Sequence, residues 1–149
     1  MTQEELLVTY ERAWNTRDAG ACAECFAHDG VRELRLLLPC ASVGHRDPLI
    51  RGREEIAEHV GRVMDSVPDL SVEVLGAAYS SDRRLWTEWR VTGTIADDLG
   101  RRPTGGRPID VVGVSVFRLS NEGFTEERLY WDSALVLGGA TTRAGPEPA

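Results

Sequence analysis

Residues 108–135 read PIDVVGVSVFRLSNEGFTEERLYWDSAL, and this stretch decides the fold class. Along 108–119 and again along 124–135 the pattern has a period of two, and we interpret each segment as a β-strand. Asn121-Glu122-Gly123 lies between the two segments and has the composition of a tight turn. We therefore predict two consecutive antiparallel strands here.

The period of two extends toward the N-terminus of this stretch. Ser81-Asp82 marks a turn between two further strands. Residues 39–52 contain two prolines and two glycines, which is the composition of a loop. The elements predicted on this side are a β-like segment at 31–38, a loop at 39–52, strands at 71–79 and 84–95, and a longer connection at 97–107.

The N-terminal part of the chain carries helical signals instead. Thr2 and Glu5 have the spacing of a capping box, and apolar residues then repeat at helical spacing as far as Trp14. Asp18 can cap a second, short helix that runs to about Ala27. A third helix is predicted over 53–66, and Pro68 prevents the helix from continuing further.

Helices followed by a run of antiparallel strands predict an α+β fold. We expect a single domain over residues 1–138, in which about three helices pack on one face of a curved antiparallel sheet. Such a sheet makes a cone, and the space inside it is where a small-molecule pocket would lie. Residues 139–149 are rich in Gly, Ala, Pro and Thr, and we expect a disordered tail.

Composition excludes several classes of function. The 149 residues carry a net charge of −7, and all 17 basic residues are arginine. Without lysine there is no Schiff-base chemistry and no Walker phosphate loop, and the negative charge argues against a nucleic-acid partner. No apolar run reaches the length of a membrane span, and the polar N-terminus does not read as a signal peptide. We expect a cytoplasmic protein without a membrane partner.

Six short motifs, in order over about residues 4–138, resemble the nuclear-transport-factor-two-like superfamily. The resemblance is closest to its SnoaL-like branch, which includes polyketide cyclases and proteins called ester cyclases. The motifs are Trp14-Asn15-Thr16-Arg17-Asp18, Gly52-Arg53-Glu54-Glu55-Ile56, Val67-Pro68-Asp69-Leu70, Glu88-Trp89-Arg90-Val91-Thr92-Gly93-Thr94, Pro103-Thr104-Gly105 and Tyr130-Trp131-Asp132.

The resemblance implies roles for two residues. Asp132 matches the aspartate that is the general acid/base of SnoaL-like cyclases, and Tyr10 matches the tyrosine that holds the oxyanion in ketosteroid isomerases. The chain departs from both patterns near Ser115, where the cyclases often carry a histidine and the isomerases a second oxyanion acid. The resemblance to limonene-type epoxide hydrolases again implies a role for Asp132, with Glu88 standing in for a missing carboxylate.

The residues themselves add candidates. Asp132 precedes a stretch of small apolar residues, where burial would raise the pKa of its carboxyl group toward neutrality. Other candidates for catalysis or substrate binding share a strand face or lie one helical turn from Tyr10. They are Trp86, Glu88 and Arg90 on one strand face, Tyr130 on the face of Asp132, and Trp14 beside Tyr10. The simpler interpretation of Glu88 and Arg90 is a cross-strand ion pair on the solvent side, and strand periodicity alone also allows Trp89 and Val91 to face inward instead.

We expect no metal and no cofactor. Cys22-x-x-Cys25 with His28 invites a zinc interpretation, but this motif lacks a second ligand pair at zinc spacing. Two small cysteines on the core-facing side of a helix are the simpler interpretation.

Three functions stay open from the sequence. The first is a biosynthetic enzyme that uses Asp132 and Tyr10 to move protons during cyclisation or isomerisation of a polyketide-like substrate. The second is epoxide opening by water that Asp132 activates, with Glu88 or Arg90 assisting. The third is a non-catalytic ligand-binding or dimerisation module. We also predict a homodimer, because both faces of the strand at 108–119 carry apolar residues.

Overall fold

The computed structural model describes residues 1–36, 49–97 and 105–132. The elements, in chain order, are α1 Gln3–Asn15, α2 Ala19–Glu24, β1 Phe26–Leu36, β2 Leu49–Arg51, α3 Gly52–Ser66, β3 Ser71–Ser80, β4 Arg84–Thr94, β5 Pro108–Ser120 and β6 Gly123–Trp131. The predicted α+β class is confirmed. Most of the predicted loop at 39–52, the Pro103-Thr104 motif and the predicted tail lie outside the described residues.

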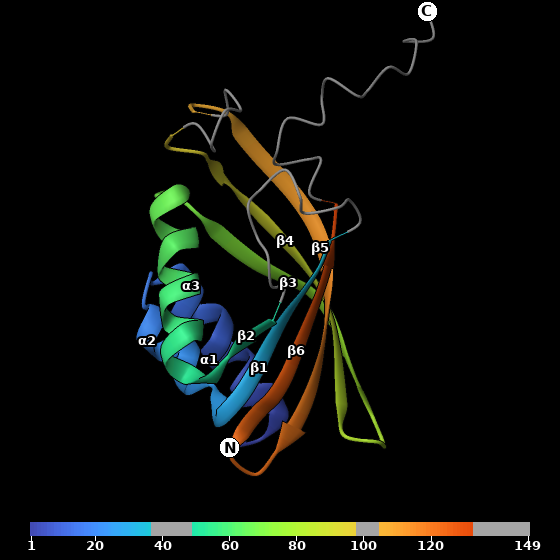
Figure 1. Cartoon of the computed structure of the whole chain (residues 1–149). Coiled ribbons are helices and arrows are strands. Elements are labelled where there is room, and N and C mark those ends of the chain that lie inside the picture. Colours follow the sequence, from blue (N-terminus) through green and yellow to red (C-terminus); the bar gives the residue numbers. More distant parts are fainter. Residues whose placement is uncertain (37–48, 98–104, 133–149) are drawn as a thin grey trace, which may run out of the picture.

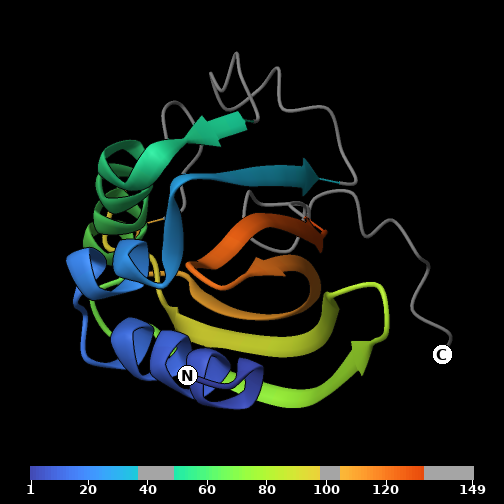
Figure 2. The same cartoon turned by 90° about the horizontal axis from the view of Figure 1, so that it is seen from below.

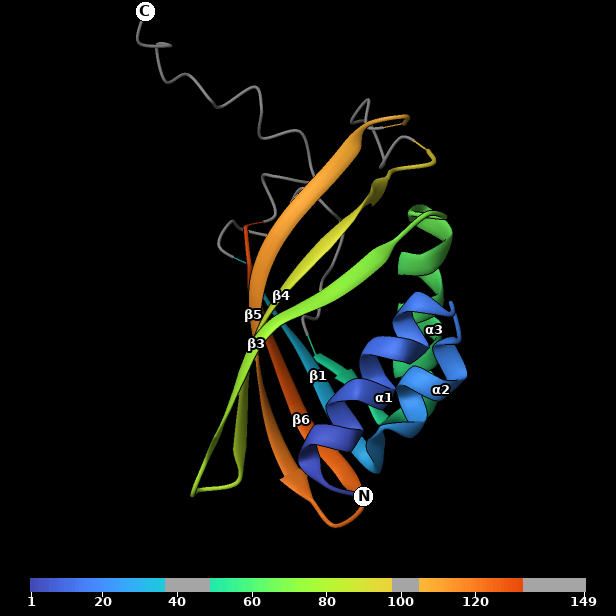
Figure 3. The same cartoon turned by 180° about the vertical axis from the view of Figure 1, so that it is seen from behind.

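The strands form one six-stranded sheet in the order β2-β1-β6-β5-β4-β3. The sheet curls around on itself, and the three helices lie on one of its faces (Figures 1 and 2). Figure 3 shows the same layering from behind. We call the side of the sheet that carries the helices the helix-facing side, and the opposite side the outer face.

The sheet is antiparallel except at one pair. β1 and β6 run parallel, whereas the other four pairings are antiparallel as expected. The parallel pair joins the strand that follows α2 to the last strand of the described chain. It sets residues from opposite ends of the sequence side by side, and the candidate site depends on this pairing.

The second helix is shorter than predicted. It ends at Glu24, and Phe26 and Ala27, expected near the end of that helix, begin β1 instead. The N–H of Phe124 donates to the carbonyl of Cys25, and Phe26 pairs with Phe124 in the sheet. Sheet pairing with a distant strand therefore overrides the local helical signal.

The helix-facing side holds the core. Tyr10 of α1 packs edge-on against Trp14, Phe26, Phe117 and Phe124. Such edge-to-face contacts stabilise the core beyond the burial of area alone.

Among the described residues, no helix is long and apolar enough to cross a membrane.

Polar contacts fix α1 against the edge strand β3. The side-chain amide of Asn15 both donates to the carbonyl and accepts from the N–H of Val72, and Glu11 accepts from the N–H of Val74. These contacts tie the helix that carries Tyr10 to one edge of the sheet. They set the distance between Tyr10 and the strands behind it.

Candidate functional site

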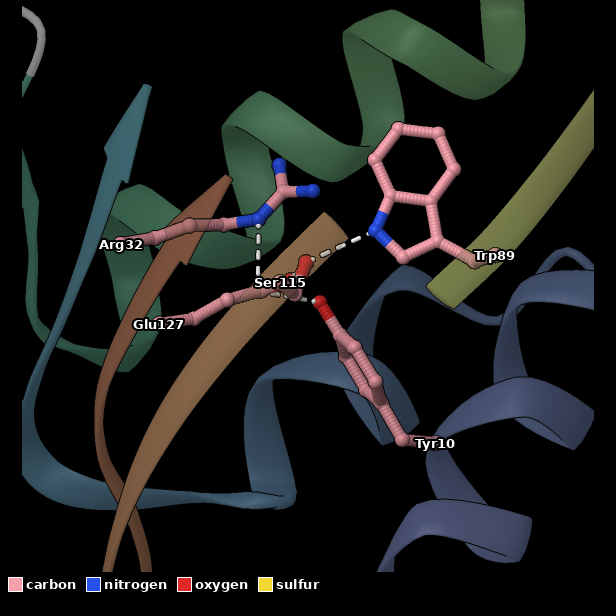
Figure 4. Close-up of polar contacts among 5 residues, drawn as sticks. All are labelled: Tyr10, Arg32, Trp89, Ser115 and Glu127. Carbon is pink, nitrogen blue, oxygen red and sulfur yellow. Dashed lines mark hydrogen bonds and ion pairs between the residues drawn. The ribbon is translucent and has the colours of Figure 1, made fainter. Parts of the chain in front are cut away.

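Five side chains form a polar network on the helix-facing side of the sheet (Figure 4). Tyr10 comes from α1, Arg32 from β1, Trp89 from β4, Ser115 from β5 and Glu127 from β6. All except Trp89 are buried, although they include two oppositely charged groups. Burying charged groups is costly unless they are paired and hydrogen-bonded. In this network the two charged groups, Arg32 and Glu127, are both paired and hydrogen-bonded.

Glu127 is the centre of the network. Its Oε2 accepts from the hydroxyl of Tyr10 at 2.8 Å and from Nε of Arg32 at 3.0 Å. Its Oε1 accepts from the hydroxyl of Ser115 at 2.9 Å. The carboxylate thus accepts from three buried donors and is held in one orientation.

Ser115 is oriented from its other side. The indole Nε1 of Trp89 donates to Oγ of Ser115 at 2.9 Å. An indole nitrogen can only donate, so Ser115 must use its own hydrogen toward Glu127. The direction of this chain of hydrogen bonds is therefore fixed.

Tyr10 keeps its proton. Burial, followed by the negative charge of Glu127, raises the pKa of its hydroxyl well above the ordinary value. The neutral phenol donates its single hydrogen to Glu127. The resemblance implies that Tyr10 would donate to a substrate oxygen, but in this structure that hydrogen is already used.

Arg32 is held by two contacts. Its Nε donates to Glu127, and its guanidinium carbon lies 5.3 Å from the centre of the Trp14 ring, a cation–π distance. Its terminal nitrogens point away from Glu127 in Figure 4. Among the described residues, the hydrogen bond of its side chain is the one that Nε makes to Glu127.

Sheet register explains why these residues meet. Arg32 and Glu127 are direct partners across the parallel β1–β6 pair, and Ser115 and Glu127 are near neighbours across β5 and β6. Glu127 faces the helices because β6 has an extra residue, Thr125, opposite β5. Such a bulge shifts the alternation of a strand by one position.

The bulge also determines which way Tyr130 faces. Tyr130 is a candidate substrate-binding residue from the sequence, and the structure places it on the other side of the sheet from Tyr10. Tyr130 and Arg128 lie opposite Val114 and Val116 of β5, on the outer face, whereas Leu129 lies opposite Ser115 on the helix-facing side. Asp132 is half-buried, one residue beyond the end of β6. The structure therefore does not group Tyr130 with Tyr10, and the side chain of Asp132 is outside the network described above.

The predicted strand face with Trp86, Glu88 and Arg90 is the outer face. All three are exposed, and Arg90 forms an exposed ion pair with Asp110 at 2.6 Å. Of the two arrangements that the sequence leaves open, the structure has the solvent-side face with a cross-strand ion pair, not the pocket wall, because the alternate residues of β4 face the helices. Trp89 belongs to that alternate set. Of the predicted site residues, the structure brings together Tyr10 and Trp14, both near Arg32.

Sequence reasoning missed Glu127 and Arg32, although usable signals were present. Glu126 and Glu127 are consecutive in a strand, so one of the two must face the core in either register. Arg32 alternates with Leu34 and Leu36 in the predicted β-like segment at 31–38, so it shares their apolar side of the strand. A charged residue at the start of an apolar strand face indicates a buried ion pair.

Cys22 of α2 and Cys25, the C-cap of that helix, are both buried, and neither forms a disulfide. Burial raises the pKa of Cys22 to about 12 and that of Cys25 to about 11, while His28 is exposed. In the described parts of the chain, no three His, Cys, Asp or Glu side chains gather as metal ligands would.

Comparison with known proteins identifies a family. The family model described as the SnoaL-like domain matches residues 7–127. No protein among those with curated functions matches the chain.

Solved structures share the fold. A hypothetical protein with a ketosteroid isomerase-like fold from Catenulispora acidiphila is 22% identical, with a TM-score of 0.71 over 92% of each chain. A protein proposed to be an isomerase, from Bacillus subtilis, is 18% identical, with a TM-score of 0.73 over 91% of each chain. A protein proposed to be a polyketide cyclase, from Xanthomonas campestris, is 19% identical, with a TM-score of 0.70 over 91% of this chain and 93% of that one.

Proposed function

Because this chain belongs to the family of SnoaL-like domains, we propose that it is a biosynthetic enzyme that moves protons on an apolar, oxygenated, polyketide-like substrate. The reaction class is removal of a proton from a carbon next to a carbonyl group. This step begins both cyclisation and isomerisation of such molecules.

The observation that carries the proposal is the carboxylate of Glu127, buried and aligned by Tyr10, Ser115 and Arg32. A general base must lie in a fixed position within reach of the proton that it takes. Glu127 therefore takes the role that the resemblance implies for Asp132. Tyr10 and Ser115 act as positioning residues, because both give their hydrogens to the carboxylate.

The test is hydrogen–deuterium exchange on a simple ketone. In heavy water, NMR follows the loss of the proton signals next to the carbonyl of β-tetralone, with and without protein. The protein should accelerate this exchange, and Glu127→Gln should slow the catalysed rate by about 100-fold or more. Glu126→Gln is the matched control, because Glu126 is the neighbouring carboxylate on the outer face, and it should keep the rate within about twofold.

The two carboxylates can be separated in the same assay. If Asp132 is the acid/base, as the sequence predicts, Asp132→Asn should lose about 100-fold and Glu127→Gln should lose little. Our proposal expects the larger loss in Glu127→Gln. A protein that binds ligands and never accelerates exchange would instead be the non-catalytic module.

The geometry gives epoxide opening less support. That alternative needs Glu88 or Arg90 beside the reacting carboxylate, and both are exposed on the outer face. A cytoplasmic location stays a prediction from the sequence.

We further propose that the protein is a homodimer that joins through the outer face. Ile109, Val111 and Phe117 are buried under the helices, whereas Val112 and Val114 of the same strand remain 49% and 37% exposed. A second copy would cover this apolar patch. Light scattering should give twice the 16.4 kDa mass of one chain at micromolar concentration. A mass of one chain would contradict the dimer.

A further inference from the structure

The indole of Trp89 links strand β4 to the carboxylate of Glu127 (Figure 4). Its Nε1 donates to Oγ of Ser115 at 2.9 Å, and that hydroxyl donates to Oε1 of Glu127, also at 2.9 Å. Among the described contacts, Oε2 of Glu127 has two donors, whereas Oε1 is held by Ser115. The position of Oε1 therefore depends on the direction in which the hydroxyl of Ser115 points.

The hydroxyl of Ser115 is directed from β4. A serine hydroxyl carries one hydrogen, which rotates to suit its surroundings. The indole of Trp89 donates to the oxygen and thereby leaves that hydrogen for the carboxylate. Thr87, also on β4, donates from its hydroxyl to the backbone carbonyl of Ser115 at 3.1 Å. Of these two contacts from β4, the one from Trp89 acts on the serine side chain.

Gly113 makes room for this indole. Trp89 and Gly113 are direct partners across β4 and β5. A Cβ atom on Gly113 would lie 2.5 Å from Cζ2 and from Cη2 of the Trp89 ring. Carbon atoms in contact are normally about 3.5–4.0 Å apart, so Gly113→Ala would displace the ring by about 1 Å. A ring pushed away from β5 in this way no longer holds Nε1 within hydrogen-bond distance of Ser115.

Close packing, and not backbone conformation, explains a glycine at position 113. Gly113 is not among the described glycines that have a positive φ angle, and a glycine in the middle of a strand weakens it. The same Cβ would also lie 2.9 Å from the backbone carbonyl oxygen of Tyr130 on β6. Of the two close approaches, the one to the Trp89 ring is the shorter.

From these contacts we infer that Trp89 is a positioning residue for the proposed reaction, and that it is held against Ser115 because Gly113 has no side chain. The inference rests on the proposed function, because the atom that it positions is Oε1 of Glu127, the proposed base. Trp89 acts through Ser115. A misplacement of about 1 Å at a reacting group can cost about 100-fold in rate, so the direction of these two hydrogen bonds affects the reaction.

The exchange assay on β-tetralone tests the role of Trp89. Trp89→Phe keeps an aromatic ring and removes the N–H, and it should lower the maximal rate of exchange by about 10-fold. The concentration of β-tetralone that gives half of this rate should stay within about twofold, because a positioning residue acts on the reaction and not on binding. Trp86→Phe is the matched control and should keep the wild-type rate, because Trp86 of the same strand is 43% exposed on the outer face.

NMR tests the place of the indole without any substrate. The protein has four tryptophans, and each gives one indole N–H signal in a nitrogen–proton correlation spectrum. Trp89→Phe identifies the signal of Trp89. In Gly113→Ala this signal should move, and its hydrogen should exchange with heavy water at least about 10-fold faster. Gly76→Ala is the matched control and should leave the signal unchanged, because a Cβ at Gly76 would meet no atom within 4 Å.

A double variant tests whether Gly113 acts through Trp89. The phenyl ring of Trp89→Phe lacks the two carbons that a methyl group at position 113 would meet. Adding Gly113→Ala to Trp89→Phe should therefore change the exchange rate of β-tetralone by less than about twofold. If the losses of the two single variants multiply instead, the methyl group acts through the carbonyl of Tyr130 and the role of Gly113 is wrong.

Folding of these variants, followed by circular dichroism, is decided in the same way. If Gly113→Ala folds only in combination with Trp89→Phe, the indole is the group that the methyl displaces, and the role of Gly113 is supported. If neither the single nor the double variant folds, the carbonyl of Tyr130 is the cause and that role is wrong.

The two proposals fail in different ways. If wild-type protein accelerates exchange and Trp89→Phe does so within about twofold of it, the proposed function stands and the role of Trp89 is wrong. If wild-type protein does not accelerate exchange, the proposed function is wrong. The hold of Gly113 on Trp89 then stands if Gly113→Ala speeds exchange of the indole hydrogen. It is wrong if the indole hydrogen of Trp89 already exchanges in the wild-type protein as fast as that of the exposed Trp86.

Discussion

Breaking the buried pair of Arg32 and Glu127 should destabilise the fold strongly, and changing both partners should cost less than the sum. Nε of Arg32 lies 3.0 Å from Oε2 of Glu127, and the two side chains are 6% and 3% exposed. Glu127→Gln keeps the shape and leaves the guanidinium without its counter-charge. Arg32→Met leaves the carboxylate with Tyr10 and Ser115 as its remaining donors.

The expected magnitudes follow from burial. Removing one partner of a buried ion pair costs about 3–5 kcal/mol, so the two single variants together would cost about 6–10 kcal/mol. The double variant has no unpaired charge, and it should cost about 2–3 kcal/mol less than that sum. Each single variant should still fold in buffer if the wild-type protein has the usual 5–15 kcal/mol of stability.

The assay is urea unfolding followed by circular dichroism, with the free energy of unfolding extrapolated to water. The matched control is the ion pair of Glu33 and Arg35, at 2.8 Å on the same strand but with Arg35 half exposed. Its coupling energy should be about 0–1 kcal/mol. If the Arg32 and Glu127 costs are additive within about 0.5 kcal/mol, the two groups do not stabilise one another and our reasoning is refuted.

Three further outcomes are expected. Arg17→Ala should lower the free energy of unfolding by about 1–2 kcal/mol, because its guanidinium donates to backbone carbonyls at the end of α3; no change in urea unfolding would contradict this. Val114→Arg should convert a dimer into a monomer by light scattering, since it places a charge in the exposed apolar patch; an unchanged mass would exclude this face. In a Cys40→Ser background, Cys22 and Cys25 should resist thiol reagents at pH 8 until urea is added, and stability should fall as the pH rises above about 9, because burial raises both pKa values; rapid native labelling would show that the thiols are accessible.

Most of the elements and the family could be predicted from the sequence, because their signals are local. The start of β1 at Phe26 and the short strand β2, which lies inside the predicted loop at 39–52, could not. The capping box of Thr2 and Glu5 appears in the structure as expected, with both hydrogen bonds formed. The strands of the second half follow from the period of two, and the motif series agrees with the family model over residues 7–127. Each of these features depends on residues within a few positions of one another.

The candidate site could be predicted only in part. Tyr10 was a candidate because the resemblance implies an oxyanion role at its position, and its place on the apolar face of α1 is readable from helical spacing. Glu127 was missed because a single extra residue, Thr125, shifts the faces of β6, and counting by two from Phe124 points to Glu126 instead. The same shift sends Tyr130 to the outer face.

The sequence by itself determined the elements and the residue types available for chemistry, and tertiary structure decided which of them meet. Arg32 and Glu127 are 95 positions apart and pair because β1 and β6 lie parallel. No local pattern encodes that pairing, because it joins distant segments in a curved sheet whose one face the helices bury. That burial determined that Glu127, and not Glu126, faces the helices. It also determined which face of β4 lies toward them.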